Sequence, residues 1–149
     1  MKFKFPLQKV LEHRKIIEDL AQKDFLDAVS VMNREHDHLT LRNQAMRSAH
    51  ERAGSLVAGG GYQGPALTQI HEFIQGQKVR IAQQEKIVQQ AEKLVESKRE
   101  VLRQAAQEYK IMEKMRENKF DAYKADRLTR EQLEMDEQSF LRFKAVKES

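Results

Sequence analysis

The stretch GSLVAGGGYQGPA, residues 54–66, holds five of the six glycines and one of the two prolines in a chain of 149 residues. Glycine and proline are the residues least compatible with a helix interior, so this segment predicts a break between two long helices. Pro65 follows Gly64, and proline suits the first turn of a helix because its missing N–H would have no partner there. The segment therefore predicts one reversal of an all-α chain: a long antiparallel two-helix coiled-coil hairpin.

The sequence after this turn repeats apolar residues every seven positions. Seven of seven positions are apolar or aromatic in one series, and four of seven are apolar in the series three residues later. The two series are Leu67, Ile74, Ile81, Val88, Val95, Leu102, Tyr109 and Ile70, Gln77, Gln84, Ala91, Lys98, Ala105, Met112. Such a repeat is typical of a coiled-coil helix. The first series continues with Arg116, Tyr123, Arg130 and Glu137, so we expect the covered part of this helix to end near residue 116.

The sequence before the turn shows a looser pattern at spacings of three, four or seven residues. Its members are Ile17, Ala21, Phe25, Ala28, Met32, Leu39, Met46, Ala49, Ala53 and Leu56, and Leu7, Val10 and Leu11 extend it toward the N-terminus. A first helix of about 52 residues, paired residue by residue from the turn, would cover the second helix to about residue 117, because both helices have the same rise. That is where the heptads end, so we expect a C-terminal helical overhang.

These patterns predict one hairpin domain over residues 1–149. We expect helix 1 at about residues 6–57, a glycine-rich turn at 58–65, helix 2 at about 66–142, and a frayed tail at 143–149. Pro6 is expected to open helix 1 as Pro65 opens helix 2.

Composition excludes several classes of function. The chain has no cysteine, so disulfide scaffolds and thiolate chemistry are excluded. No window is apolar enough to cross a membrane, and we expect a soluble cytoplasmic protein. The 27 basic and 23 acidic residues are interleaved along the chain, which indicates salt-bridged helix surfaces rather than a nucleic-acid-binding stripe.

The sequence offers no motif for catalysis or cofactor binding. The glycine-rich turn is not a phosphate loop, because Gly64 is followed by Pro65 instead of the Lys-Ser/Thr pair that binds phosphates. His36 and His38 are two positions apart and point to different sides of a helix, so they do not chelate one metal ion. A thin hairpin also provides no pocket. We therefore expect no enzyme activity, no metal and no cofactor.

The expected overhang, residues 110–149, mixes ten basic and nine acidic residues with scattered large apolar ones. Leu133 and Phe140 are seven positions apart, and Met112, Met115 and Tyr123 suggest a second weak stripe. Two interpretations remain open: a solvated, fraying helix, or a helix whose stripe is covered by another protein.

Three stretches together resemble one protein family. KFKFPLQKVLEHRKIIEDLAQ, residues 2–22, resembles the N-terminal signature of the FliJ family of flagellar type III export proteins. The matching positions are Phe3, Phe5, Leu7, Val10, Leu11 and Arg14. QEYKIMEKMRENK (107–119) and EQLEMDEQS (131–139), with Asp136-Glu137, are similar to the C-terminal half of the family.

The resemblance implies a non-enzymatic coiled-coil component of the flagellar export apparatus. Such a protein inserts into the hexameric ring of the export ATPase, stimulates it, couples it to the cytoplasmic domain of the membrane export gate, and escorts export chaperones. The implied location is the bacterial cytoplasm, peripherally on the inner membrane at the flagellar base. Neither nucleic acid nor a small-molecule substrate is implied as a partner.

The resemblance also implies two binding surfaces. The ATPase-ring surface comprises Phe3, Phe5, Met112, Met115, Tyr123, Leu133 and Phe140. The export-gate surface comprises Phe73, Ile74 and Gln75, which match a Phe-Ile-Gln run of the family, with His38, Arg42, Ala45 and Ala49, which differ from the family's residues. The alternatives are the equivalent stalk of a virulence injectisome, and a coiled-coil chaperone or scaffold that needs no ATPase.

Overall fold

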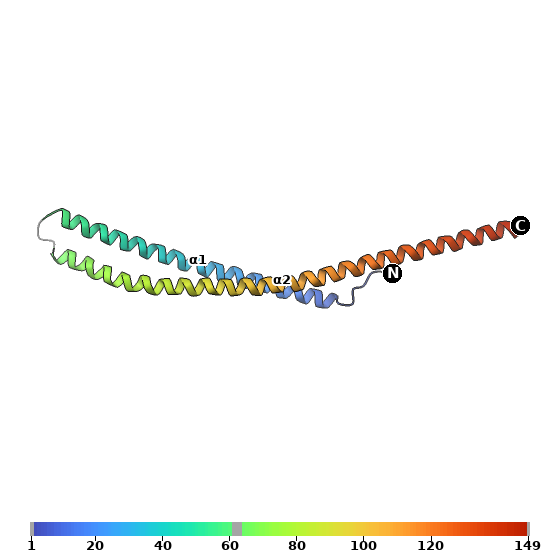
Figure 1. Cartoon of the computed structure of the whole chain (residues 1–149), viewed down its shortest axis with the longest axis horizontal. Coiled ribbons are helices and arrows are strands. Elements are labelled where there is room, and N and C mark those ends of the chain that lie inside the picture. The colour runs from blue at the N-terminus through green and yellow to red at the C-terminus, as the bar shows by residue number, and fades with distance from the viewer. Residues whose placement is uncertain (1, 61–63, 149) are drawn as a thin grey trace. The chain divides into compact units, whose positions relative to one another are not determined.

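A computed structural model describes residues 2–60 and 64–148 and confirms the all-α hairpin. Helix α1 spans Gln8–Ala58 and helix α2 spans Gly64–Glu148, and the described residues contain no strand. The two helices lie side by side and run in opposite directions (Figure 1). By their contacts the residues form two compact units: unit 1 comprises residues 1–19 and 104–149, and unit 2 comprises residues 20–103. The sequence analysis expected a single domain, and both helices contribute to both units.

The glycine-rich segment ends α1 as its composition predicts. The N–H of Gly59 donates to the carbonyl of Ser55 at 3.0 Å, and Gly60 takes a left-handed conformation with φ of 67° that favours glycine. Helix α2 begins at Gly64, so Pro65 occupies its first turn. Residues 61–63 of the expected turn lie outside the described residues.

The heptad seam is confirmed by burial. All fourteen positions of the two series on α2 are buried or half-buried. Three of them are polar: Lys98 is half-buried, and Gln77 and Gln84 are each only 5% exposed. The side-chain N–H of Gln84 donates to Glu35 on α1, at 2.9 Å to its backbone oxygen and 2.7 Å to its carboxylate. Because a buried amide needs such partners, this contact favours one register of α1 against α2 within unit 2.

Each unit has a small apolar core. In unit 2, Ala49 of α1 packs with Ile70 and Ile74 of α2, and the partly buried Met46, Ala53 and Leu56 of α1 lie against this cluster. In unit 1, Phe5 and Leu11 pack with Met112, and the partly buried Phe3 and Tyr109 cover this cluster.

Three local expectations differ from the structure. Pro6 does not open α1: it lies in a turn closed by the N–H of Gln8 donating to the carbonyl of Phe5 at 3.1 Å, and α1 begins at Gln8. Leu7 and Val10 are exposed rather than part of the seam, and the buried residues in this region are Phe5 and Leu11, which pack with Met112. Helix α2 continues to Glu148 instead of fraying from residue 143.

Candidate partner-binding surfaces

An aromatic cluster holds the segment before α1 against α2 in unit 1. The ring of Phe3 lies 5.2 Å from that of Phe120, at 61°, and 5.5 Å from that of Tyr123. Edge-on contacts of this kind are favourable because the positive edge of one ring meets the negative face of the other. The guanidinium of Arg116 lies 6.0 Å from the Phe3 ring on the same surface. Residues 2–7 are thus tied to α2 by one aromatic anchor.

Polar contacts between α1 and α2 flank this anchor. Arg14, one of the residues that carries the family resemblance, forms an ion pair and hydrogen bond with Glu108. The guanidinium of Arg116 donates through Nε to the side-chain oxygen of Gln8 at 3.2 Å. These side chains are largely exposed, so each contact adds little stability but helps to fix the helix ends.

The residues expected to bind an ATPase ring fall into two groups. Phe5 and Met112 are buried in the unit 1 core, so they support the surface rather than form it. Phe3 and Tyr123 are half-buried in the aromatic cluster. Met115, Leu133 and Phe140 are exposed, as a contact surface requires. The sequence analysis missed Phe120, although its position three residues before Tyr123 on the same helix face was a usable signal.

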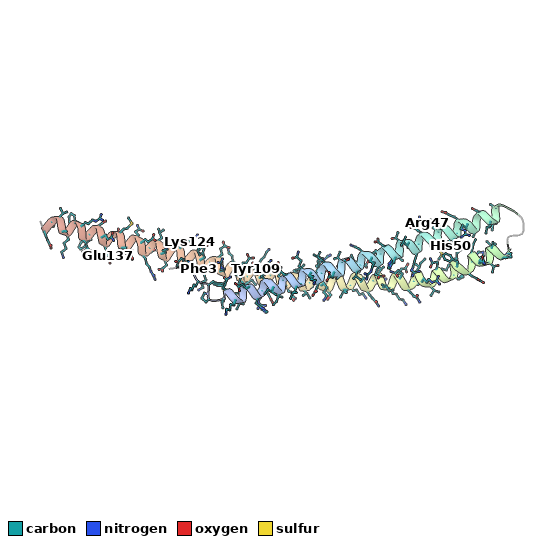
Figure 2. All side chains as sticks on the ribbon, turned by 180° about the vertical axis from the view of Figure 1, so that it is seen from behind. Phe3, Arg47, His50, Tyr109, Lys124 and Glu137 are labelled. Carbon is teal, nitrogen blue, oxygen red and sulfur yellow. The ribbon has the colours of Figure 1, made fainter. Side chains whose placement is uncertain are left out.

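The C-terminal part of α2 has a continuous exposed surface. Every residue from 124 to 148 is exposed. A shallow hollow on this part is lined by Leu133, Asp136, Glu137, Phe140 and Leu141. We call these five residues the terminal face. In Figure 2, Tyr109, Lys124 and Glu137 follow one another along α2, and Phe3 lies beside α2 near Lys124.

Two of the hollows along the α1–α2 groove of unit 2 are lined by residues expected at the export gate. Phe73 of α2, 43% exposed, lines the first with Ala45 and Ala49 of α1. His38 and Arg42 of α1 line the second with Leu41 and Gln77. The structure thus brings together five of the seven residues expected at an export-gate surface.

The other two expected gate residues lie elsewhere. Ile74 is only 3% exposed and belongs to the unit 2 core, and Gln75 is exposed but lines neither hollow. The second hollow contains polar atoms that a partner could satisfy: Arg42 Nε and Gln77 Oε1 are buried and have no hydrogen-bond partner among the described residues. Gln77 was recognised in the sequence only as a polar seam residue.

Charged groups cluster next to the second hollow. The hydrogen bond from Gln84 holds the pKa of the Glu35 carboxyl below its ordinary value, and nearby His38 and Arg34 act in the same direction. His36 Nε2 lies 3.0 Å from Glu92 Oε1 on the facing helix. The Gln84–Glu35 and His36–Glu92 contacts join α1 to α2 beside the hollow.

The described residues contain no group of three or more His, Cys, Asp or Glu side chains arranged to hold a metal ion. Within residues 2–60 and 64–148, neither helix has a stretch long and apolar enough to span a membrane.

These features define a helical-hairpin protein with exposed apolar side chains along its helices. Residues 3–148 match the family described as the flagellar FliJ protein, and the chain belongs to that family. The family is a non-enzymatic component of flagellar export, so the chain is a flagellar export-related protein. No curated protein and no solved structure matches the chain.

Proposed function

We propose that this chain is the non-enzymatic stalk of the flagellar export ATPase, acting at the inner membrane at the flagellar base. In this proposal the terminal face and the aromatic cluster bind inside the hexameric ATPase ring and stimulate hydrolysis. The two hollows of unit 2 bind the cytoplasmic domain of the export gate, and the chain also escorts export chaperones. One observation carries the proposal: in a FliJ-family chain, 25 consecutive residues of α2, 124–148, are exposed.

The chemistry of this surface suits a ring lumen. Leu133, Phe140 and Leu141 are about 60% exposed, and large apolar side chains grouped on one surface mark an interaction site. Charges of both signs surround them, and exposed ion pairs are individually weak. Contacts of that kind orient a partner and can exchange readily, which suits a stalk that moves relative to its ring.

The test is the hydrolysis rate of the purified cognate export ATPase with and without this chain. The full chain is expected to raise the rate. The double variant Leu133→Ser/Phe140→Ser is expected to need at least about tenfold more protein for the same effect, since each lost apolar contact weakens binding. The matched control is Leu128→Ser/Met135→Ser, which alters residues of similar exposure on α2 that do not line the hollow.

The possible results separate the proposal from its alternatives. A chain that leaves ATP hydrolysis unchanged and does not associate with the ATPase contradicts the stalk function. Equal loss in both double variants would show that the C-terminal helix acts through general hydrophobicity, and that the terminal face is not the contact.

A further inference from the structure

The terminal face lies on the part of α2, residues 124–148, that no other described residue of unit 1 covers. Leu133, Phe140 and Leu141 share one hollow with Asp136 and Glu137, and all of residues 124–148 are exposed. A helix without tertiary contacts gains little stability from propensity alone. Most helices in proteins are stabilised by packing an apolar face against another element. A second helix packed on this face would bury its apolar side chains and stabilise the helical conformation of residues 124–148.

The charges around this face are segregated into two blocks. Residues 131–137 contain four carboxylates and no cation, namely Glu131, Glu134, Asp136 and Glu137. Residues 142–147 contain three cations and no carboxylate, namely Arg142, Lys144 and Lys147. The residues between the blocks, 138–141, are uncharged and include Phe140 and Leu141. An acidic block and a basic block thus lie on opposite sides of an apolar centre.

From this arrangement we infer that the C-terminal helix pairs with the same helix of a second copy of the chain, in antiparallel orientation about a twofold axis near Phe140. Antiparallel pairing places each acidic block beside the partner's basic block, whereas parallel pairing places like charges together. Opposite charges at corresponding positions along the two helices favour the antiparallel orientation, and like charges at those positions disfavour the parallel one. Because both copies use the same surface, this isologous contact forms a closed dimer and does not propagate to further copies.

The blocks are also spaced symmetrically about the centre. Glu137 lies three residues before Phe140 and Lys144 three residues after Leu141, and Glu134 and Lys147 lie six before and six after. When Phe140 of one copy lies opposite Leu141 of the other, Glu137 is aligned along the helix axis with Lys144 of the second copy, and Glu134 with Lys147. The twofold symmetry repeats each of these pairs. Leu133, Glu137, Phe140, Lys144 and Lys147 follow one another at spacings of four and three, which places them on one helix face. Glu134, next to Leu133 in the sequence, lies at the edge of this face.

This association is independent of the proposed ATPase contact, but it uses the same face. The dimer covers the apolar side chains while the chain is outside its ring, and a chain cannot be paired and bound through this face at once. The area involved is one short helix pair, so the dimer is weak and reversible, as suits a surface that must be released.

The test is sedimentation velocity of the full chain at increasing protein concentration. The wild-type chain is expected to pass from monomer to dimer. The dissociation constant is expected to rise at least about tenfold from low to high NaCl, because the Debye length falls about threefold between 0.05 and 0.5 M salt. A chain that stays monomeric at the highest concentration, or whose dimer is insensitive to salt, overturns the inference.

Charge exchange gives the sharper test. Glu134→Lys/Glu137→Lys and Lys144→Glu/Lys147→Glu each place like charges across the twofold axis, so each alone is expected to dimerise at least about tenfold more weakly. Mixed together, the two variants restore opposite charges at every matched height and are expected to form a heterodimer about as tight as wild type. Failure of the mixture to associate, or wild-type self-association by either variant alone, overturns the antiparallel pairing. Circular dichroism confirms that both variants remain helical.

The two proposals fail in distinguishable ways. A chain that stimulates the ATPase but never dimerises contradicts only the pairing, and a chain that dimerises but leaves ATP hydrolysis unchanged contradicts only the stalk function.

Discussion

The ring of Phe3 packs edge-on against the ring of Phe120, with centroids 5.2 Å apart, and so joins the segment before α1 to a residue more than a hundred positions later in the sequence. Tyr123 adds a second ring at 5.5 Å. The same segment supplies Phe5 to the unit 1 core. The aromatic N-terminal signature of the family therefore has a structural reason in this chain: it fastens residues 2–7 to α2.

Phe3→Ala is expected to release this segment. The loss of the aromatic contacts should lower the free energy of unfolding by about 1–2 kcal/mol, since such pairs contribute beyond their buried area and Phe3 is only partly buried. Hydrogen exchange of the amides of residues 2–8 should become faster, while exchange in unit 2 stays unchanged. Lys4→Ala, an exposed neighbour, is the control. Unchanged exchange in Phe3→Ala would show that Phe5 alone holds the segment.

The periodicity of the sequence was sufficient to predict the hairpin. Glycine and proline marked the reversal, and the heptads identified the buried positions of α2, including Gln77 and Gln84. The looser pattern on α1 was less reliable. Leu7 and Val10 fit the spacing but are exposed. Leu7 precedes α1, where the non-helical chain brings Phe5 into the core, and Val10 lies on α1 beside the buried Leu11.

The surfaces were only partly predictable. The family resemblance does not distinguish a residue that supports a surface from one that forms it, so Phe5, Met112 and Ile74 were assigned to contacts although they are buried. Phe120 was missed because its partner, Phe3, comes from the far end of the chain. The end of α2 was placed too early, although i,i+4 ion pairs such as Arg127–Glu131 and Arg130–Asp126 support the helix.

The contact between Glu35 and Gln84 predicts a dependence of stability on pH. The Glu35 pKa is lower in the folded chain than its ordinary value, first because of the Gln84 hydrogen bond. A carboxylate with a lowered pKa stabilises the fold above its unfolded pKa of about 4.3, and that contribution is lost as the pH falls through the folded value. Thermal unfolding of the wild-type chain should therefore shift downward below about pH 4.

Glu35→Gln isolates this contribution from that of the other carboxylates. The variant keeps an oxygen that can accept from Gln84 but does not titrate, so its melting temperature should fall less than that of wild type over the same acidic range. Glu96→Gln, on an exposed carboxylate of α2 in the same unit, should behave like wild type. Parallel pH profiles for all three chains would show that Glu35 is not responsible.

The first hollow of unit 2 predicts a separable gate contact. Phe73→Ala should weaken binding to the cytoplasmic domain of the export gate by about tenfold or more, since an exposed aromatic in a hollow is a typical binding hot spot. Ile87→Ala is the matched control, because Ile87 is also 43% exposed on α2 and lines neither hollow. ATPase stimulation should be unchanged in both. Loss of gate binding in Ile87→Ala, or loss of ATPase stimulation in Phe73→Ala, would show that the gate surface is misplaced.

Removing the terminal part of α2 separates folding from ATPase stimulation. A chain ending at Lys124 keeps Phe120 and Tyr123, and therefore the anchor for Phe3, but lacks the exposed residues 125–148. Its melting temperature should stay within a few degrees of wild type, because the removed residues bury little apolar surface, while ATPase stimulation should be lost. A chain ending at Lys119 loses the anchor as well and should melt lower. Full stimulation by the chain ending at Lys124 would place the ring contact on the aromatic cluster instead of the terminal face.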